Sequence, residues 1–316
     1  MKLIKSKAEL IIQKNGINEL YKHIEKCSRV CYKSEDKITE SSAKPFVDRM
    51  IKSNHLAMLE HGTVYLKIPN HGVKDAPEDC IESWTRYENN PYSKCCEIPY
   101  NDPYELFVTT NFRVVQENGW LDDLKYLCEP TEFHEKRYTF KVTTSIGVTR
   151  EFNRHRVNSI AEQSTRYCNY SKDKFGNEVT FIKPYWFKES QLPIDLHVAQ
   201  PSFENGAVFF ERPYKAYLGD TDTIGYDWHK EDFFIHSCQT AEQCYFLMLN
   251  EGAAPQDARD VLPLCTATEA VYTAFESDWR HFFDLRLRGT TGKPHPNMQE
   301  LAELMHKQLK QKGIEL

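Results

Sequence analysis

The chain has 316 residues, 40% of them apolar, and is long enough to bury a substantial hydrophobic core. Its 40 lysine and arginine residues are outnumbered by 46 aspartate and glutamate residues, which gives a formal net charge of -6. This charge argues against a protein that coats nucleic acid, and no apolar run approaches the length of a membrane span or resembles a signal peptide. We therefore expect a cytoplasmic protein that contacts neither nucleic acid nor membrane, with its 10 cysteines reduced.

The first half of the chain predicts two helices followed by strands. Apolar side chains recur every three or four residues in segments 17–30 and 42–54, which is the helical period. Segments 63–68 and 138–144 alternate apolar and polar residues, as half-buried strands do. Between these two strands, the polar and proline-containing stretch up to about residue 103 predicts an irregular insertion, and a short helix is expected after it, near Asn111.

The second half predicts further helices and one more strand. Ser145 is placed to cap a helix that runs through Phe152 toward Arg156. A second irregular region is expected at 169–225. The remaining predicted elements are a helix at 231–250, a helical turn that begins at Pro255, a strand at 268–274, and amphipathic helices at 276–287 and 297–311. The mixture indicates the α+β class, and no linker or internal repeat divides the chain, so a single domain is expected to span 1–316.

One segment concentrates groups that bind anions. From Arg154 to Tyr167 it contains three arginines, a histidine, a carboxylate and three aliphatic hydroxyls. Guanidinium groups match phosphate oxygens in charge and geometry, and serine hydroxyls with backbone N–H groups can supply the remaining donors. The competing interpretation is a solvated basic face, with His155 buried in the core and Glu162 neutralising an arginine.

Two further arginines occur in the C-terminal third. Arg259 lies in the segment Asp-Ala-Arg-Asp-Val-Leu-Pro-Leu, and Arg286 lies in Phe-Phe-Asp-Leu-Arg-Leu-Arg. Composition alone favours an ion pair of Arg259 with Asp257 or Asp260. The remaining histidines and cysteines have no spacing that predicts a metal site.

Together these segments resemble the flavin-dependent thymidylate synthases of the ThyX family. The family signature has Arg-His-Arg, two free positions, Ser, a short spacer, Ser, one free position and Arg. The matching residues are Arg154, His155, Arg156, Ser159, Ser164 and Arg166, with Glu162 in the acidic position between the serines. Arg259 matches an arginine that precedes Leu-Pro-Leu in the family, and Arg286 matches the arginine that reaches the pyrimidine.

The N-terminal part resembles the same family less closely. His55 and the pair Glu60-His61 resemble its His and Glu-His pair. Cys31 and Ala57 stand where members carry a serine and a threonine, the threonine near the flavin phosphate. The resemblance implies a single ThyX-like domain with a mixed helix and antiparallel-sheet core, and insertions at about 70–135 and 170–230.

The resemblance also implies roles for individual residues. Arg286 is expected to be catalytic, because a permanent guanidinium at the O2/N3 edge of uracil stabilises negative charge in the ring. The expected cofactor-binding residues are Arg154, His155, Arg156, Glu162, His55, Ser277 and His281. The expected substrate-binding residues are Glu151, Arg154, Glu162, Ser164, Arg166, Arg259 and Arg286.

The activity implied by the resemblance is the conversion of dUMP to dTMP. Methylenetetrahydrofolate is the expected carbon donor, NADPH the reductant and FAD the hydride carrier, in a homotetramer with active sites shared between subunits. Two alternatives stay open. One is a related flavoenzyme that leaves a hydroxymethyl group on the pyrimidine nucleotide. The other, from a different class, is a module that only binds the phosphates of nucleotides or nucleic acids, which the overall negative charge argues against.

Overall fold

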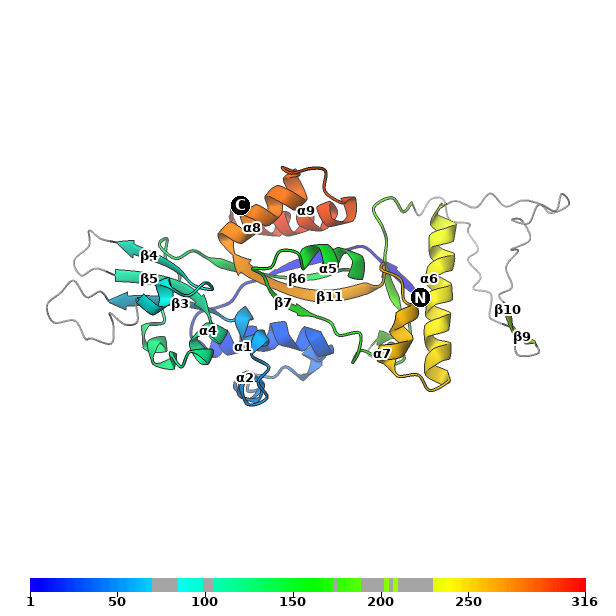
Figure 1. Cartoon of the computed structure of the whole chain (residues 1–316), viewed down its shortest axis with the longest axis horizontal. Helices are drawn as coiled ribbons and strands as arrows, with labels where there is room; N and C mark the ends of the chain where they lie inside the picture. The colour runs from blue at the N-terminus through cyan, green and yellow to red at the C-terminus, as the bar shows by residue number, and fades with distance from the viewer. Residues whose placement is uncertain (70–84, 99–104, 173–174, 189–201, 205–206, 210–229) are drawn as a thin grey trace.

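The computed structural model describes residues 1–69, 85–98, 105–172, 175–188, 202–204, 207–209 and 230–316 (Figure 1). At its centre is a four-stranded antiparallel sheet with the strand order β2-β6-β11-β7. Its strands are β2 (Lys7–Ile11), β6 (Arg137–Ser145), β11 (Ala267–Phe275) and β7 (Ser159–Glu162). The strands predicted at 138–144 and 268–274 are confirmed as β6 and β11.

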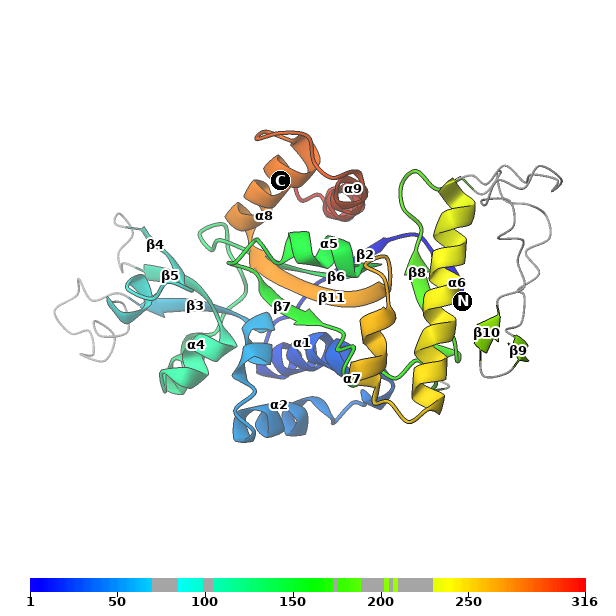
Figure 2. The ribbon, with the colours of Figure 1, turned by 45° about the vertical axis from the view of Figure 1, so that its right-hand side comes forward.

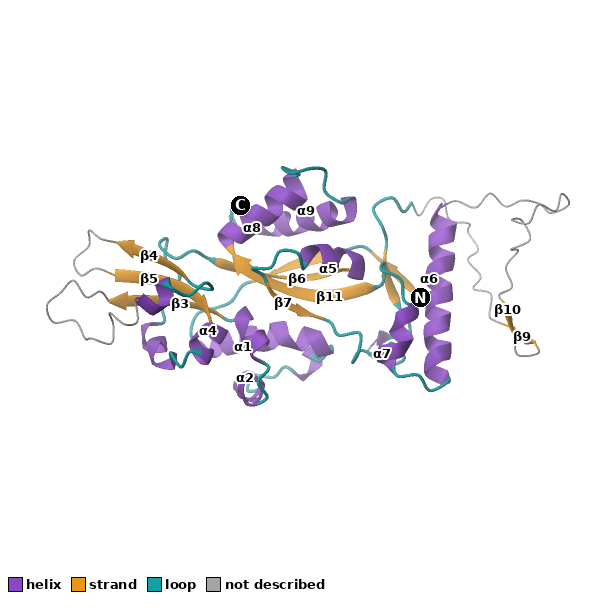
Figure 3. Ribbon diagram, viewed as in Figure 1, coloured by secondary structure: helices purple, strands orange, loops and turns teal. Residues whose placement is uncertain are grey.

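Helices cover both faces of this sheet (Figures 1 and 3). On one face lie α5 (Ile146–Phe152), α8 (Glu276–Phe283) and α9 (Pro296–Gln311), and on the other lie α1 (Ile17–Arg29) and α2 (Ala43–Lys52). Successive side chains of β11 point to opposite faces of the sheet, so the strand contributes to the cores on both sides. Tyr272 belongs to the core under α8 and α9, whereas Val271 packs with Cys27 of α1. The predicted α+β class is therefore confirmed.

A second sheet extends the molecule on the side of α1 and α2. It has the order β3-β5-β4, and its strands are β3 (Thr63–Pro69), β5 (Glu105–Asn111) and β4 (Lys94–Ile98). The helix α4 (Phe112–Glu117) follows β5, as predicted, and shares a core with α1 and α2. The prediction of an irregular stretch up to about residue 103 is wrong for β4, which pairs along β5. The strand β5 was not expected either. Long-range pairing forms this sheet, which local periodicity does not reveal.

A third layer lies at the other end of the central sheet (Figure 2). Here β1 (Lys2–Ile4) pairs in parallel with β8 (Thr180–Ile182), beside α6 (Lys230–Asn250) and α7 (Pro255–Ala258). The predicted helices at 231–250 and after Pro255 are confirmed. A short hairpin, β9 (Ser202–Glu204) with β10 (Ala207–Phe209), falls in the second predicted insertion, most of which lies outside the described residues. No helix in the described part of the chain is both long and apolar enough to cross a membrane.

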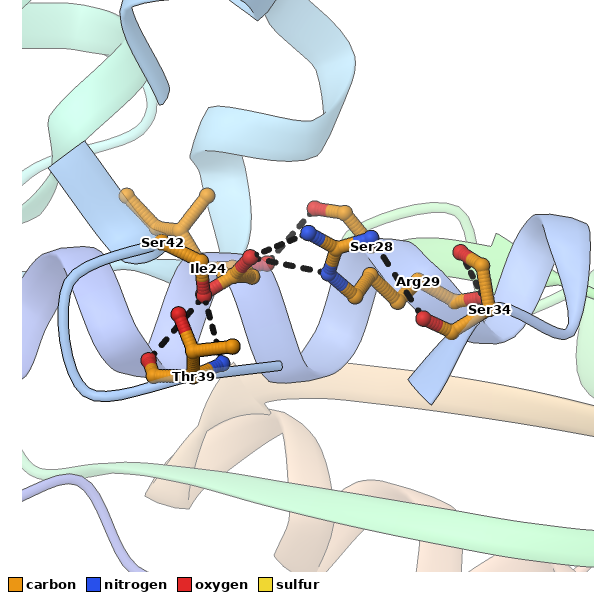
Figure 4. A network of polar contacts seen from close by, with 7 residues as sticks. Ile24, Ser28, Arg29, Ser34, Thr39 and Ser42 are labelled. Carbon is orange, nitrogen blue, oxygen red and sulfur yellow. Dashed lines mark hydrogen bonds and ion pairs between the residues drawn. The ribbon is translucent and has the colours of Figure 1, made fainter. Parts of the chain in front are cut away.

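The C-terminal end of α1 is fixed by a buried ion pair (Figure 4). Arg29 donates from Nε and Nη2 to Oε1 of Glu25 at 2.8 and 2.6 Å, and both side chains are buried. Ser42, just before α2, donates its hydroxyl to the second carboxylate oxygen at 2.8 Å. A buried ion pair is tolerated when further hydrogen bonds satisfy the carboxylate. The arrangement ties α1 to α2 and fixes the turn η1 (Val30–Tyr32), which carries Cys31.

Candidate active site

The anion-binding segment begins where α5 ends. Ser145 caps this helix as predicted, since its Oγ accepts the backbone N–H of Val148 at 3.3 Å. The helix nevertheless stops at Phe152, and the prediction that it runs toward Arg156 is wrong. The ring of Phe152 stacks on Tyr272 of β11 with 3.8 Å between centroids, and the Tyr272 hydroxyl donates to Asn153 at 3.2 Å. These contacts hold the last turn against the sheet.

After α5 the chain turns and then becomes a strand. The backbone N–H of His155 donates to Phe152 at 3.0 Å, and that of Asn158 donates to His155 at 3.2 Å. Residues 159–162 then pair with β11 as β7, which the sequence analysis did not predict. As a result His155 points inward, with 9% of its surface exposed, whereas Arg154 and Arg156 are exposed.

Four residues singled out by their resemblance to the family lie around Arg286. This group, the Arg286 cluster, consists of Glu151, His155, His281, Arg286 and His295. Arg286 donates from Nε to Nε2 of His155 at 3.1 Å, and its Nη1 lies 3.5 Å from a carboxylate oxygen of Glu151. The other oxygen of Glu151 lies 3.8 Å from Nδ1 of His295, and the ring of His281 lies 6.3 Å from that of His155.

The environment of His155 keeps its ring neutral. Burial, together with the positive charges of Arg286, His281 and Arg154, lowers the pKa of His155 to about 4. The competing interpretation of His155 as a buried, satisfied histidine is thus correct about burial, but its hydrogen-bond partner is the predicted catalytic arginine.

Arg286 lies on a distorted extension of α8. The predicted helix at 276–287 has regular geometry only to Phe283, and Asp284–Arg288 form a wider π-helical turn (η9). Such turns change the direction of side chains and occur often at functional sites. The turn ends at Gly289, whose φ of +68° favours glycine, and a Cβ atom there would lie only 3.0 Å from Gly292 and Pro294.

A second group, the Arg259 cluster, lies beyond the other end of β7. It consists of Ser164, Thr165, Arg166 and Arg259. Arg259 donates from Nη1 to the Thr165 hydroxyl at 2.8 Å. Among the described residues, its one acidic partner is exposed Asp260, with an oxygen 4.0 Å from Nε, so the ion pair that composition favoured is weak.

In the rest of the Arg259 cluster, Arg166 is exposed, whereas Ser164 and Thr165 are half-buried. The Arg166 guanidinium lies 4.9 Å from the centre of the Tyr167 ring and donates to its hydroxyl. The backbone N–H of Ser164 donates to the carbonyl of Cys31 at 2.9 Å, which fixes the start of this segment against the end of α1. Thr165 thus has an arginine on each side: Arg166 follows it in the sequence, and the Arg259 guanidinium is hydrogen-bonded to its hydroxyl.

Glu162 lies at the end of β7, between the two clusters along the chain. Its carboxylate accepts the Thr149 hydroxyl at 2.9 Å. Burial raises its pKa, while hydrogen bonds from Thr149, Asn153 and Thr268 partly oppose that shift. The expectation that Glu162 neutralises an arginine is not met by a direct ion pair among the described residues.

The other predicted flavin residues lie in separate places. His55 is exposed and lines a cavity of about 460 Å³ together with Cys31, Ala57 and Arg113, on the α1 side of the sheet. Ser277, at the start of α8, donates its hydroxyl to Glu135 instead. Arg154 and Arg156 have no ion pair with any residue that the structure describes. One chain therefore brings His155 and His281 together, but it leaves His55 on the α1 side of the sheet, away from them.

Three residues at these sites were missed by the sequence analysis. Thr149 and Thr165 are the hydroxyl partners of Glu162 and Arg259, and Arg113 lines the cavity beside His55. Thr165 could have been noticed, because it lies between Ser164 and Arg166. The other two carry no signal in sequence, because their roles depend on packing between distant segments.

Comparison with known proteins identifies the family. A family model described as thymidylate synthase complementing protein (Thy1, or ThyX) matches residues 96–312, more than half of the chain. The chain belongs to this family. The matched range includes Arg154–Arg166, Arg259 and Arg286, but neither Cys31 nor His55. Membership of the family makes this protein a thymidylate synthase-like enzyme of the methyltransferase type.

Solved structures that are similar to this chain include that of the UMP/dUMP methylase PolB from Streptomyces cacaoi. Its crystal structure with 5-Br UMP has 16% sequence identity and a TM-score of 0.41, and the alignment covers 98% of this chain and 92% of that chain. The structure with 5-Br dUMP has 17% identity and the same TM-score, and covers 98% and 93%. A comparison with curated proteins finds no significant match.

Proposed function

We propose that this ThyX-family protein is a flavin-dependent thymidylate synthase. It converts dUMP to dTMP, takes a one-carbon unit from methylenetetrahydrofolate, and uses NADPH as reductant through FAD. The balance requires a reductant: dUMP, methylenetetrahydrofolate, NADPH and a proton give dTMP, tetrahydrofolate and NADP⁺. When bound, the flavin supplies the hydride that turns the transferred methylene into a methyl group.

The observation that carries the proposal is the orientation of Arg286. Its Nε and Nη1 are held by His155 and Glu151, and Nη2 has no acceptor among the described residues. The side chain is 21% exposed, so part of it is accessible to a ligand. A fixed cation at the O2/N3 edge of uracil stabilises the negative charge that develops in the ring during attack on the methylene carbon.

The Arg259 cluster fits the phosphate of the nucleotide. Arg166 and Arg259 supply two cationic donors, and Ser164 and Thr165 supply hydroxyl groups beside them. A dianionic phosphate prefers such charge-assisted donors. Arg259 is only weakly paired within the described chain, so binding a phosphate requires no strong ion pair to break.

The two clusters favour an active site shared between subunits. Residues 156–163 separate His155 from Ser164 along the chain, and four of them form β7, roughly 13 Å of extended strand. We propose that the pyrimidine end of the nucleotide binds the Arg286 cluster of one subunit, and that its phosphate binds the Arg259 cluster of another subunit in a homotetramer.

The donor set also fits a flavin. Arg154 and Arg156 are exposed cations without a carboxylate partner among the described residues, which suits a diphosphate. The cavity beside His55 has room for an extended part of a ligand, and Cys31 and Ala57 line it. The separate positions of these residues again favour binding between subunits.

The decisive experiment measures the product and the reductant together. Purified protein with FAD, dUMP, methylenetetrahydrofolate and NADPH should form a product of the mass of dTMP, with one NADPH oxidised per product. A hydroxymethyl product would have a different mass, and its formation from water and the methylene group would oxidise no NADPH. Product of that mass would reject the synthase in favour of the hydroxymethylase.

A phosphate-binding module without catalysis is the remaining alternative, and membership of an enzyme family argues against it. It predicts a colourless protein that forms no product. UMP and dCMP should be tested beside dUMP, and preferential turnover of either would overturn the assignment of dUMP as substrate.

A further inference from the structure

The contact between His155 and Arg286 joins two motifs that lie 131 positions apart in the sequence. Arginine Nε always carries a hydrogen, so Nε2 of His155 must be the acceptor and the ring proton must be on Nδ1. The contact thus defines the tautomer of His155. It also requires a neutral ring, because an imidazolium has no acceptor to offer.

Aromatic packing fixes the imidazole itself. The ring of Phe282, on α8, lies 5.1 Å from it, and that of Phe152, on α5, lies 6.4 Å away. Phe152 and Phe282 in turn stack with 4.6 Å between their centroids. The acceptor that faces Arg286 is therefore held by the core and not by a mobile surface side chain.

The charges around the pair are mixed. The positive charge of Arg286 disfavours a proton on His155. His281, which lies one turn before Arg286, and Arg154, which directly precedes His155, act in the same direction. The carboxylate of Glu151 faces Arg286 from α5 and is shared with His295, which precedes α9. The neutral imidazole therefore accepts from Arg286 without cancelling its positive charge, whereas Glu151 contributes a partial counter-charge.

We propose that His155 is a positioning residue for Arg286, in addition to any contact that it makes with the flavin. Its neutral ring and Glu151 hold two nitrogens of the guanidinium, so that Nη2 points toward the pyrimidine. This inference rests on the proposed function. Without the imidazole, the arginine keeps its charge but gains rotational freedom, which weakens any interaction that depends on its direction.

A double-mutant cycle on nucleotide binding tests the inference. The variants are His155→Phe, which keeps an aromatic ring but removes the acceptor, Arg286→Ala, and the double variant. Calorimetry on the flavin-loaded protein measures the Kd of dUMP in each. We expect His155→Phe to weaken binding about 10-fold when Arg286 is present, and less than twofold in the Arg286→Ala background.

Rescue and flavin content separate positioning from other roles. His155→Gln can place its amide oxygen near the position of Nε2, and we expect it to restore most of the binding and of kcat, with flavin content unchanged. Equal losses of dUMP binding in both backgrounds, or loss of flavin in His155→Phe with unaltered dUMP binding, would overturn the positioning role. Failure of the unmodified protein to bind dUMP would instead reject the proposed function itself.

Discussion

Arg286 is a charged side chain whose direction is set by two contacts. His155 and Glu151 approach it from the same segment, the end of α5 and the turn that follows. The closest cation in sequence, Arg288, is used differently, because it pairs with Asp284 and donates to the carbonyl of Leu316. The two arginines of one turn thus provide a matched pair for mutagenesis.

We expect Arg286→Ala to abolish most dTMP formation while the protein stays folded and retains its flavin spectrum. Loss of a single charge-stabilising donor typically lowers kcat about 10²- to 10³-fold. The matched control is Arg288→Ala, which should retain activity. If Arg286→Ala stays within a few-fold of the unmodified protein, Arg286 has no part in the mechanism.

Arg166 and Arg259 are expected to act on the phosphate. Replacing either with alanine should weaken dUMP binding by about 1.5–3 kcal/mol, the usual contribution of a charged hydrogen bond. Deoxyuridine, which lacks the phosphate, should bind equally weakly to the variants and to the unmodified protein. Arg280→Ala is a suitable control, because Arg280 is exposed and pairs with Glu276. Normal dUMP binding in calorimetry would contradict the assignment.

At the scale of elements, α5 and β7 position the signature. The helix is short, and it begins at the end of β6 with a side-chain cap from Ser145. Its last turn is packed against β11, and the signature then crosses to β7. The placement of Glu151 and His155 therefore depends on the stability of two turns of helix.

The cap on α5 should contribute to the stability of the folded protein. Ser145→Ala removes the acceptor for Val148, and we expect it to lower the free energy of unfolding by about 1 kcal/mol. Ser145→Thr keeps a hydroxyl acceptor and should stay close to the unmodified protein. Urea unfolding of the three proteins measures the difference. Equal stability of Ser145→Ala and the unmodified protein would mean that the cap contributes nothing.

At the scale of the whole molecule, the two clusters at opposite ends of β7 predict complementation between subunits. Arg286→Ala alone should be inactive, and Arg166→Ala alone should have little activity when the dUMP concentration is kept well below its weakened Kd. If every site takes one residue from each of two subunits, co-expression in equal amounts should restore about a quarter of the sites. Activity of tagged, co-purified hybrids is the measurement. Hybrids that stay inactive would indicate that each site is built within one chain.

A chain of buried polar groups joins α1, the central sheet and the turn η3 (Leu56–His61). His23 contacts the Thr139 hydroxyl at 3.1 Å, this hydroxyl contacts that of Thr273 at 2.8 Å, and Thr273 contacts His61 at 2.9 Å. Burial, with a smaller contribution from neighbouring positive charges, lowers the pKa of both histidines to about 3. Both rings are therefore neutral in the folded protein at neutral pH.

This network predicts loss of stability in acid. In the unfolded chain both histidines take up protons near pH 6.5, whereas in the folded protein they do so only near pH 3. The unfolded state thus binds more protons in this range, so the stabilisation is complete above pH 6.5 and is lost progressively as the pH falls toward 3. His61→Asn can keep a contact with Thr273 without titrating. Its free energy of unfolding should fall less steeply between pH 7 and 4, and an unchanged slope would contradict the account.

The sequence by itself determined the elements whose signal is local. The periodicity of α1, α2 and β6 is contained within each segment, as are the apolar composition of α6 and the cap at Ser145. The fixed spacing of the signature likewise indicated the family, which the match over residues 96–312 confirms. These features need no knowledge of distant contacts.

Only the tertiary structure decided which of these residues meet. The strand β7 forms because 159–162 pair with β11, and β5 aligns with β3 and β4. His155 contacts Arg286 because α5 and α8 pack on the same face of the sheet, and β7 places the Arg259 cluster apart from the Arg286 cluster. Spacing along a chain fixes local geometry, whereas the pairing of distant segments depends on the burial of whole faces, which no single segment encodes.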